Sequence, residues 1–147
     1  GLMTALALIF SYIEVLIPFN FGVPGIKLGI ANLVVIIALY RLGYRYALGI
    51  NTVRVLVAGL LFSGLFGALY SLAGALMSFA VMVFSVTGFS IAGGVAHNLG
   101  QILVAALLVE NIRIFVYFPV LIFSGVASGA IIGIVSYFIL RRIPEFK

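Results

Sequence analysis

The chain has 147 residues, of which 65% are hydrophobic and only 7% are charged, and its formal net charge is +5. An average soluble domain is about half apolar and about a quarter charged, so these residues cannot build a water-soluble surface. The composition therefore predicts an integral membrane protein rather than a soluble enzyme. A chain of this length has room for about six spans of roughly 20 residues each.

We expect these spans to be helices. A transmembrane β-strand would alternate polar and apolar residues, whereas residues 99–109 are apolar on nearly every face. The chain has no Cys, which excludes disulfides, thiolate metal sites and Cys nucleophiles. Its basic residues lie mainly at the ends of apolar segments, as in membrane proteins generally, so we expect a lipid bilayer around the chain and no nucleic-acid partner.

The apolar segments predict an all-α bundle of six transmembrane helices in a single domain over residues 1–147. Their approximate bounds are 2–17, 27–40, 46–62, 65–84, 91–109 and 115–140. Between the first two, residues 18–25 hold two prolines and two glycines, which forbid a regular helix. We expect this loop to cover the outward mouth of a ligand pocket, because irregular backbone at membrane depth needs protein or water around it.

The basic residues also predict the orientation. Arg41 and Arg45 lie in one turn, and Arg141, Arg142 and Lys147 lie at the carboxyl end. With six spans these two places are on the same side, which the positive-inside rule assigns to the cytoplasm. We therefore expect a multi-pass protein of the cell inner (plasma) membrane with both termini cytoplasmic.

Small residues at four-residue spacing predict where helices approach closely, because lipid provides no hydrophobic drive for helix association. We expect the fifth and sixth segments to face each other along two such rows. The rows are Ala92, Ala96 and Gly100 in the fifth segment, and Gly125, Gly129 and Gly133 in the sixth. Such rows serve either internal packing or docking against another membrane protein, and the sequence leaves both open.

Polar side chains inside apolar segments are the candidate functional residues, because each ionisable group there costs at least about 2.5 kcal/mol on insertion scales. Arg54 lies about 13 Å past Arg45 along the third segment, near the bilayer midplane, and Asn51 shares its face. The two carboxylates that could neutralise Arg54, Glu14 and Glu110, are both expected nearer the outer rim. Arg54 is therefore either part of a structural contact or a ligand-binding group.

A second polar group lies in the fifth segment, where His97 and Gln101 share a helical face and Asn98 lies beside it. The chain has no Asp and its three Glu are scattered, so we expect no metal site. Hydrogen bonding between helices and contact with a substrate remain alternatives for this group. The rim residue Lys27 is explained by interfacial solvation or by a functional role.

The sequence lacks the motifs that bind ATP or magnesium diphosphate in well-known enzymes. The chain has no Gly-x-x-x-x-Gly-Lys-Ser/Thr motif, so any ATP-driven step must come from a partner. Without Asp it also cannot assemble the aspartate-rich sites that hold magnesium diphosphate in prenyl-chain synthases. We therefore expect no enzyme activity, no catalytic residues and no cofactor.

Three stretches together resemble a known family. They are Phe21-Gly-Val-Pro-Gly-Ile-Lys-Leu-Gly-Ile-Ala-Asn-Leu33, the pair Asn51 and Arg54, and Gly93-Gly-Val-Ala-His-Asn-Leu-Gly-Gln101. The chain resembles the Gx transporter family, which is also catalogued as heptaprenyl diphosphate synthase component I. That family is similar to the substrate-binding S components of energy-coupling factor (ECF) transporters, especially the thiamine-precursor type.

The resemblance implies a six-helix S-component fold that captures a small-molecule substrate from outside. It also implies docking through the first helices onto a transmembrane coupling protein with ATPase subunits. The predicted ligand-binding residues are Glu14, Lys27, Asn32, Asn51, Arg54, His97, Asn98 and Gln101. The alternative is a non-catalytic membrane component of heptaprenyl diphosphate or menaquinone synthesis, or of an electron-transfer assembly.

Overall fold

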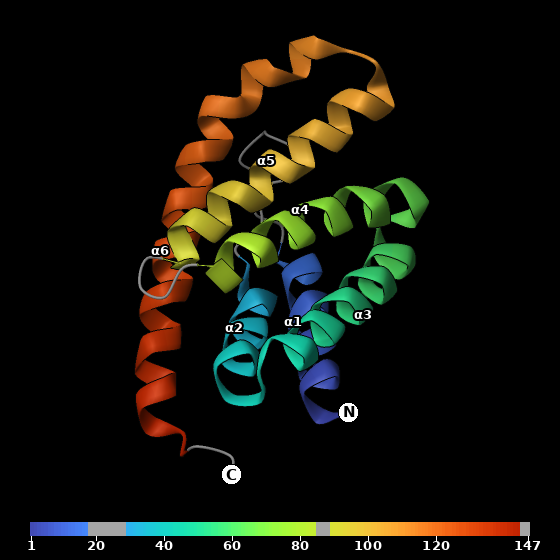
Figure 1. Cartoon of the computed structure of the whole chain (residues 1–147). Coiled ribbons are helices and arrows are strands. Elements are labelled where there is room, and N and C mark those ends of the chain that lie inside the picture. The colour runs from blue at the N-terminus through green and yellow to red at the C-terminus, as the bar shows by residue number, and fades with distance from the viewer. Residues whose placement is uncertain (18–28, 85–88, 145–147) are drawn as a thin grey trace.

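The computed structural model describes residues 1–17, 29–84 and 89–144. These residues form six α-helices and one 3-10 helix in a single bundle (Figure 1). In chain order the elements are α1 (Leu2–Leu16), α2 (Ile30–Leu42), α3 (Tyr44–Phe62), α4 (Gly64–Phe84), α5 (Phe89–Val109), the 3-10 helix η1 (Ile112–Tyr117) and α6 (Phe118–Arg142).

The helices fall into two length classes. Four stretches, Tyr44–Phe62, Gly64–Val83, Ile91–Val109 and Ile112–Arg142, are long and apolar enough to cross a membrane. Helices α1 and α2 have 15 and 13 residues and extend only about 22 and 20 Å, less than the roughly 30 Å of hydrocarbon in a bilayer. The all-helical membrane class is confirmed, whereas the count of six spans stays a prediction.

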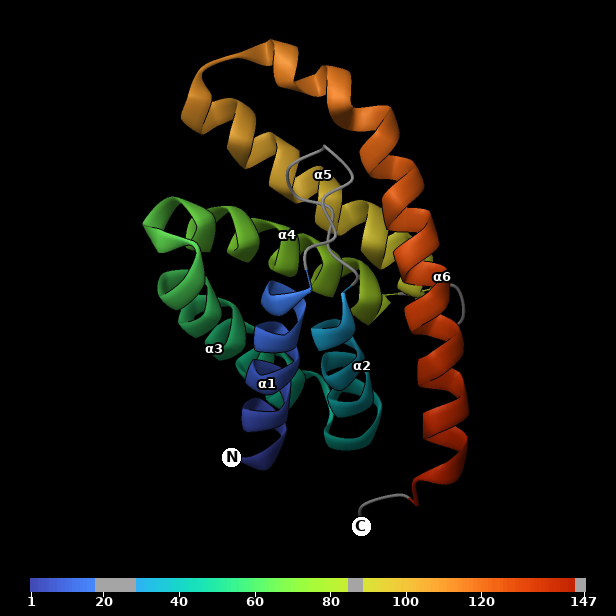
Figure 2. The same ribbon diagram turned by 180° about the vertical axis from the view of Figure 1, so that it is seen from behind.

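Helix α2 lies at the centre of one half of the bundle. It packs between α1 and α3 on one side and α6 on the other, as seen from both directions in Figures 1 and 2. Its residues from Val34 to Ala38 are all buried, and Val34 and Val35 are among the largest fully enclosed side chains. A helix that is apolar all round is stable only when protein or lipid surrounds it, and here α1, α3 and α6 supply much of that cover.

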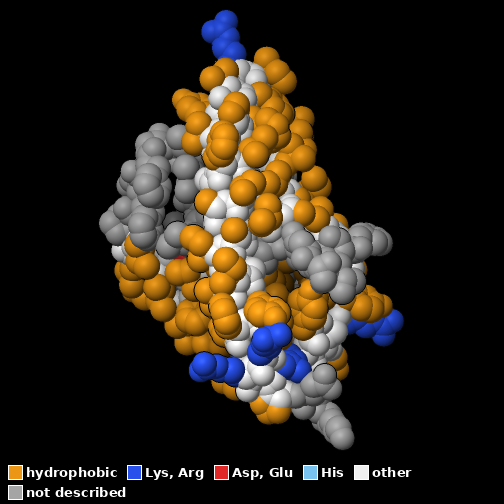
Figure 3. All heavy atoms as spheres, turned by 90° about the vertical axis from the view of Figure 1, so that its left-hand side faces the viewer, with side chains coloured by type: hydrophobic (Ala, Val, Ile, Leu, Met, Phe, Trp, Pro, Cys, Tyr) orange, Lys and Arg blue, Asp and Glu red, His pale blue; other side chains and the backbone are white. Residues whose placement is uncertain are grey.

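Four of the arginines, Arg41, Arg45, Arg141 and Arg142, lie at one end of the molecule. Gly1 and the carboxyl end of α6 lie at the same end, beside the α2–α3 turn with Arg41 and Arg45 (Figures 1 and 2). The Arg41 Nη2 atom donates hydrogen bonds to the carbonyl oxygens of Leu140 and Ile143, which satisfies carbonyls left unpaired at a helix end. Figure 3 shows most of the Lys and Arg side chains of one face near that end, below a hydrophobic surface.

Glycine contacts join α5 to both of its neighbours. A Cβ added at Gly125 of α6 would lie 2.9 Å from the carbonyl oxygen of Gly94 in α5, so the two backbones touch there. The expected facing of α5 and α6 is thus confirmed at Gly125, but its partner is Gly94. The prediction that Gly100 faces α6 is wrong, because a Cβ there would lie 2.8 Å from the carbonyl oxygen of Ala73 in α4.

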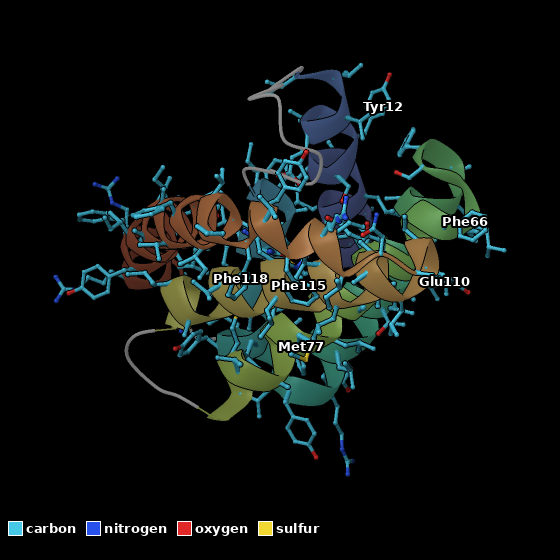
Figure 4. The ribbon with its side chains drawn as sticks, turned by 90° about the horizontal axis from the view of Figure 1, so that it is seen from above. Tyr12, Phe66, Met77, Glu110, Phe115 and Phe118 are labelled. Atoms are coloured by element: carbon cyan, nitrogen blue, oxygen red, sulfur yellow. The ribbon has the colours of Figure 1, made fainter. Side chains whose placement is uncertain are left out.

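The turn after α5 lies at the other end of the molecule. Glu110 has a positive φ of 52°, which ends the helix, and its side chain lies at the periphery of the bundle in Figure 4. The Asn111 side chain then accepts a hydrogen bond from the Arg113 backbone N–H and starts η1. The expected sixth segment therefore begins as a 3-10 helix and becomes α-helical at Phe118, whose ring lies 6.4 Å from that of Phe115.

Candidate ligand-binding site

A cavity of about 400 Å³ lies among the helices, within the range of roughly 300 to 1,000 Å³ that is typical of small-molecule sites. Every α-helix contributes to its wall. The polar lining residues are Ser11 and Glu14 of α1, Asn32 of α2, Arg54 of α3, Ser63 between α3 and α4, Ser71 of α4, His97 and Asn98 of α5, and Ser128 of α6. The apolar lining includes Val15, Ile17, Val55, Ala58 and Phe62.

The cavity lies in the half of the bundle away from the basic end. Its wall uses the carboxyl-terminal parts of α1 and α3, the amino-terminal part of α2 and the Ser63 turn. The antiparallel course of these helices brings the four places together (Figure 2). Arg41 and Arg45 lie at the opposite ends of α2 and α3.

Arg54 is the positively charged side chain among the described lining residues, and only 7% of its surface is exposed. Its Nη2 atom donates hydrogen bonds to Asn32 Oδ1 at 3.0 Å and to Asn51 Oδ1 at 2.7 Å. Within the described ranges, the buried Nε atom has no hydrogen-bond partner, and Nη1 makes no hydrogen bond but is not fully buried. The guanidinium is therefore held on one edge by two neutral amides and keeps a donor for a ligand.

Asn51 holds the Arg54 guanidinium from the side that faces away from the cavity. It lies one turn before Arg54 on the same helical face and is almost completely buried. Its Nδ2 atom donates to the carbonyl oxygen of Ala75 in α4 at 3.3 Å, while its Oδ1 accepts from Arg54. Asn51 does not line the cavity. Its place is between the guanidinium and α4, so it acts on a ligand only through Arg54.

Glu14 lies in the cavity wall, as Arg54 does. Its Oε1 atom accepts a hydrogen bond of 2.9 Å from the Ile30 backbone N–H, so the carboxylate caps the amino terminus of α2. Its charge acts on the Arg54 guanidinium, although no ion pair joins the two described side chains. The shortness of α1 and the late start of α2 explain this position, because they bring the carboxyl end of α1 beside the first turn of α2.

Asn98 and His97 are polar residues of α5 that line the cavity. The Asn98 Nδ2 atom donates to the Leu121 carbonyl oxygen at 2.6 Å and to Ser124 Oγ at 3.1 Å, which ties α5 to α6. This leaves the Asn98 carbonyl oxygen as the group able to accept from a ligand. His97 lines the same wall and lies against the backbone of Gly74 in α4, where a Cβ would be 3.1 Å from the imidazole Cε1.

Gln101 lies apart from these residues. It is fully buried at the α4–α5 contact and does not line the cavity, and a Cβ at Gly74 would lie 2.7 Å from its Cγ. Neither of its amide atoms has a hydrogen-bond partner within the described part of the chain. The structure therefore brings together Glu14, Asn32, Arg54, His97 and Asn98, with Asn51 directly behind them.

Two sequence-based expectations concern residues that the structure does not describe. Lys27 and the loop of residues 18–25 lie outside the described residues, so their proposed roles stay predictions. The serines of the wall were missed, because a Ser in an apolar helix commonly bonds its own backbone, as Ser11 does with Ala7 O at 2.9 Å. Within the described ranges no group of three His, Asp or Glu side chains could hold a metal ion.

Comparison with known proteins gives a match at the family level. The family described as heptaprenyl diphosphate synthase component I matches residues 3–139, which is nearly the whole chain. No curated protein and no solved structure matches the chain.

Proposed function

We propose, from the premise that this chain belongs to the heptaprenyl diphosphate synthase component I family, that it is the substrate-binding membrane subunit of a small-molecule uptake transporter. The observation that carries the proposal is the cavity of about 400 Å³ with the Arg54 guanidinium in its wall. In this respect the chain would resemble the S components of ECF transporters.

The cost of burying Arg54 supports a ligand role. A guanidinium inside a span needs a partner, water or a function. Its described hydrogen-bond acceptors are the neutral amides of Asn32 and Asn51, and its Nη1 donor is not fully buried. A purely structural arginine would be expected to use its donors on helix carbonyls or a carboxylate. An arginine that keeps a donor beside a cavity suits a site for an incoming acceptor group.

The position of the cavity supports capture from the outer side. The basic end, with Arg41, Arg45, Arg141 and Arg142, would face the cytoplasm under the positive-inside rule. The cavity lies in the opposite half, so it would be reached from outside. This topology has six spans and both termini cytoplasmic, in the inner membrane of the cell.

Energy for release of the ligand would come from partners. The chain has no P-loop motif, so in this proposal a transmembrane coupling protein with ATPase subunits provides the drive. Helix α1 is our candidate docking element. It lies at the side of the bundle, and Leu2, Ile9 and Leu16 each expose more than half of their surface.

The family description favours a second candidate, a non-catalytic membrane component that works with a prenyl diphosphate synthase. The absence of Asp argues against catalysis by the chain itself, because magnesium diphosphate sites are built from carboxylates. In this alternative the chain anchors the synthase or receives its lipid product at the membrane.

The proteins that accompany the chain distinguish the two candidates. The tagged chain would be purified from its own cells in mild detergent, and the retained proteins would be identified by mass spectrometry. The transporter proposal expects an integral membrane coupling protein together with ATPase subunits. Recovery of a prenyl diphosphate synthase in their place would contradict it and would favour the alternative.

A further inference from the structure

We infer that the cavity selects dipolar ligands of near-zero net charge, with an acidic or acceptor group at Arg54 and a basic or donor group at Glu14. This inference rests on the proposed function and narrows it to a class of substrate.

The described residues of the cavity wall carry one positive and one negative charge. Arg54 and Glu14 are the charged side chains among the described lining residues, and their charges have opposite signs. All the other described polar lining groups are neutral Ser and Asn side chains, or the single His. A lining whose described residues provide one cation and one anion complements a ligand that carries both kinds of group.

The two charged groups are held apart by partners of their own. Arg54 is fixed by Asn32 and Asn51, and Glu14 is fixed by the Ile30 backbone N–H. Among the described residues no ion pair links Arg54 to Glu14, and neither side chain makes a hydrogen bond beyond those given above. Arg54 Nη1 and Glu14 Oε2 therefore keep hydrogen-bonding capacity, and both side chains line the same cavity.

A bridging ligand would use both capacities at once. Without a ligand, the remaining donor of Arg54 and the remaining acceptor of Glu14 can bond only to water. A hydrogen bond from a ligand would be stronger, because the dielectric constant inside a bundle is low. A ligand with an acidic or oxo group and a basic nitrogen would satisfy both ends, as charge-assisted pairs do elsewhere. The amides of Asn32 and Asn98 keep one donor and one acceptor atom for the polar atoms between.

A diphosphate suits this cavity badly. It would bring at least two negative charges to a wall whose described residues include one guanidinium, and it would also face the Glu14 carboxylate. Like charges in a partly desolvated site repel strongly. The described lining has neither a second cation nor a carboxylate cluster that could hold magnesium. The cavity is thus a better site for a dipolar molecule than for a prenyl diphosphate.

A competition among matched probes tests this inference. The purified protein in nanodiscs would be dialysed against an equimolar mixture of 4-methylbenzoate, 4-methylbenzylamine, 3- and 4-(aminomethyl)benzoate and geranyl diphosphate, and the retained probes would be quantified by mass spectrometry. We expect the wild-type protein to retain an aminomethylbenzoate at least tenfold over both singly charged probes and over the diphosphate.

Variants that replace a Glu carboxylate by a neutral amide test which residue gives the preference for dipolar probes. Glu14→Gln keeps an oxygen that accepts from the Ile30 N–H, so α2 stays capped, and we expect the tenfold preference over 4-methylbenzoate to be lost. Glu110→Gln at the exposed turn is the matched control and should retain the wild-type preference. Preferential retention of 4-methylbenzoate or of the diphosphate by the wild type would overturn the inference. So would an unchanged preference in Glu14→Gln.

Failure of the underlying function has a different signature. If the wild-type protein retains none of the probes while the same protein is folded by circular dichroism, the cavity does not serve small polar molecules and the proposed function fails with the inference. If a singly charged probe is retained instead, the cavity is a ligand site and only the dipolar assignment falls.

Discussion

Arg54 illustrates how a charge is kept inside an apolar helix without a carboxylate in contact with it. One edge of its guanidinium donates to Asn51 on its own helix and to Asn32 on α2. Asn51 in turn is anchored to α4 through the Ala75 carbonyl oxygen. Contacts from α2, α3 and α4 thus hold this edge of the guanidinium, and Nη1 is the accessible donor that makes no hydrogen bond among the described residues.

Replacement of Arg54 by Lys separates ligand binding from structure. An ammonium retains the charge and can still donate to the two asparagines, but it loses the planar fork and the second donor edge. We expect Arg54→Lys to fold and to bind the molecule retained by wild type more weakly by about 1–3 kcal/mol. Titration calorimetry and a thermal melt measure the two effects. Lowered stability with unchanged affinity would remove Arg54 from the site.

The sequence was sufficient to find the polar residues but not their neighbours in space. Arg54, His97 and Asn98 were identified because ionisable and amide groups are rare and costly in spans. Gln101 shares a face with His97, yet it lies one turn further along α5, where Gly74 lets α4 close over it. The packing of the neighbouring helix decides which turn of a helix borders a cavity. The periodicity of one helix alone cannot predict that turn.

At the scale of elements, the order and approximate bounds of the helices were predictable from hydropathy and from Gly and Pro. The pairing of glycines was harder to predict. Gly94 contacts Gly125, whereas Gly100 contacts α4, because α5 is packed on two sides by different helices. A row of small residues at four-residue spacing predicts a close helix contact, but it does not predict which neighbouring helix makes that contact.

The Gly94 contact predicts a large effect of a single methyl group. A Cβ at Gly94 would clash with the carbonyl oxygen of Gly125, which is backbone and cannot move aside alone. We expect Gly94→Ala to destabilise the protein by about 1–3 kcal/mol, as overpacking does in other tight contacts. Thermal unfolding in detergent, followed by circular dichroism, measures the change.

Gly49 provides the matched control within α3. A Cβ there would meet nothing within 4 Å, so Gly49→Ala should be neutral or stabilising by up to about 1 kcal/mol from helix propensity. Equal melting temperatures for Gly94→Ala and the wild-type protein would mean that α5 and α6 are not packed as closely as described.

The whole molecule has two unlike ends. Arg41, Arg45, Arg141 and Arg142 mark one, and the Ser63 turn and the Glu110 turn mark the other, where the cavity also lies. This polarity follows from the sequence through the distribution of basic residues.

Labelling of single cysteines tests the orientation, and the native chain has no Cys to interfere. Asn111 is exposed at the turn after α5, and Tyr44 is exposed at the start of α3. We expect Asn111→Cys to react with an impermeant maleimide in intact cells and Tyr44→Cys to react only after the membrane is opened. The opposite pattern would place the cavity on the cytoplasmic side.

The most direct test of the account is the identity of small molecules that the purified protein releases on denaturation, measured by mass spectrometry for three forms. Ala58→Trp fills the cavity, whereas Leu61→Trp adds the same side chain where 70% of the leucine is exposed. We predict that the wild-type protein and Leu61→Trp release the same polar molecule in near-stoichiometric amount, while Ala58→Trp releases none. Release of nothing by the wild-type protein, or of equal amounts by Ala58→Trp, would contradict a ligand site in this cavity.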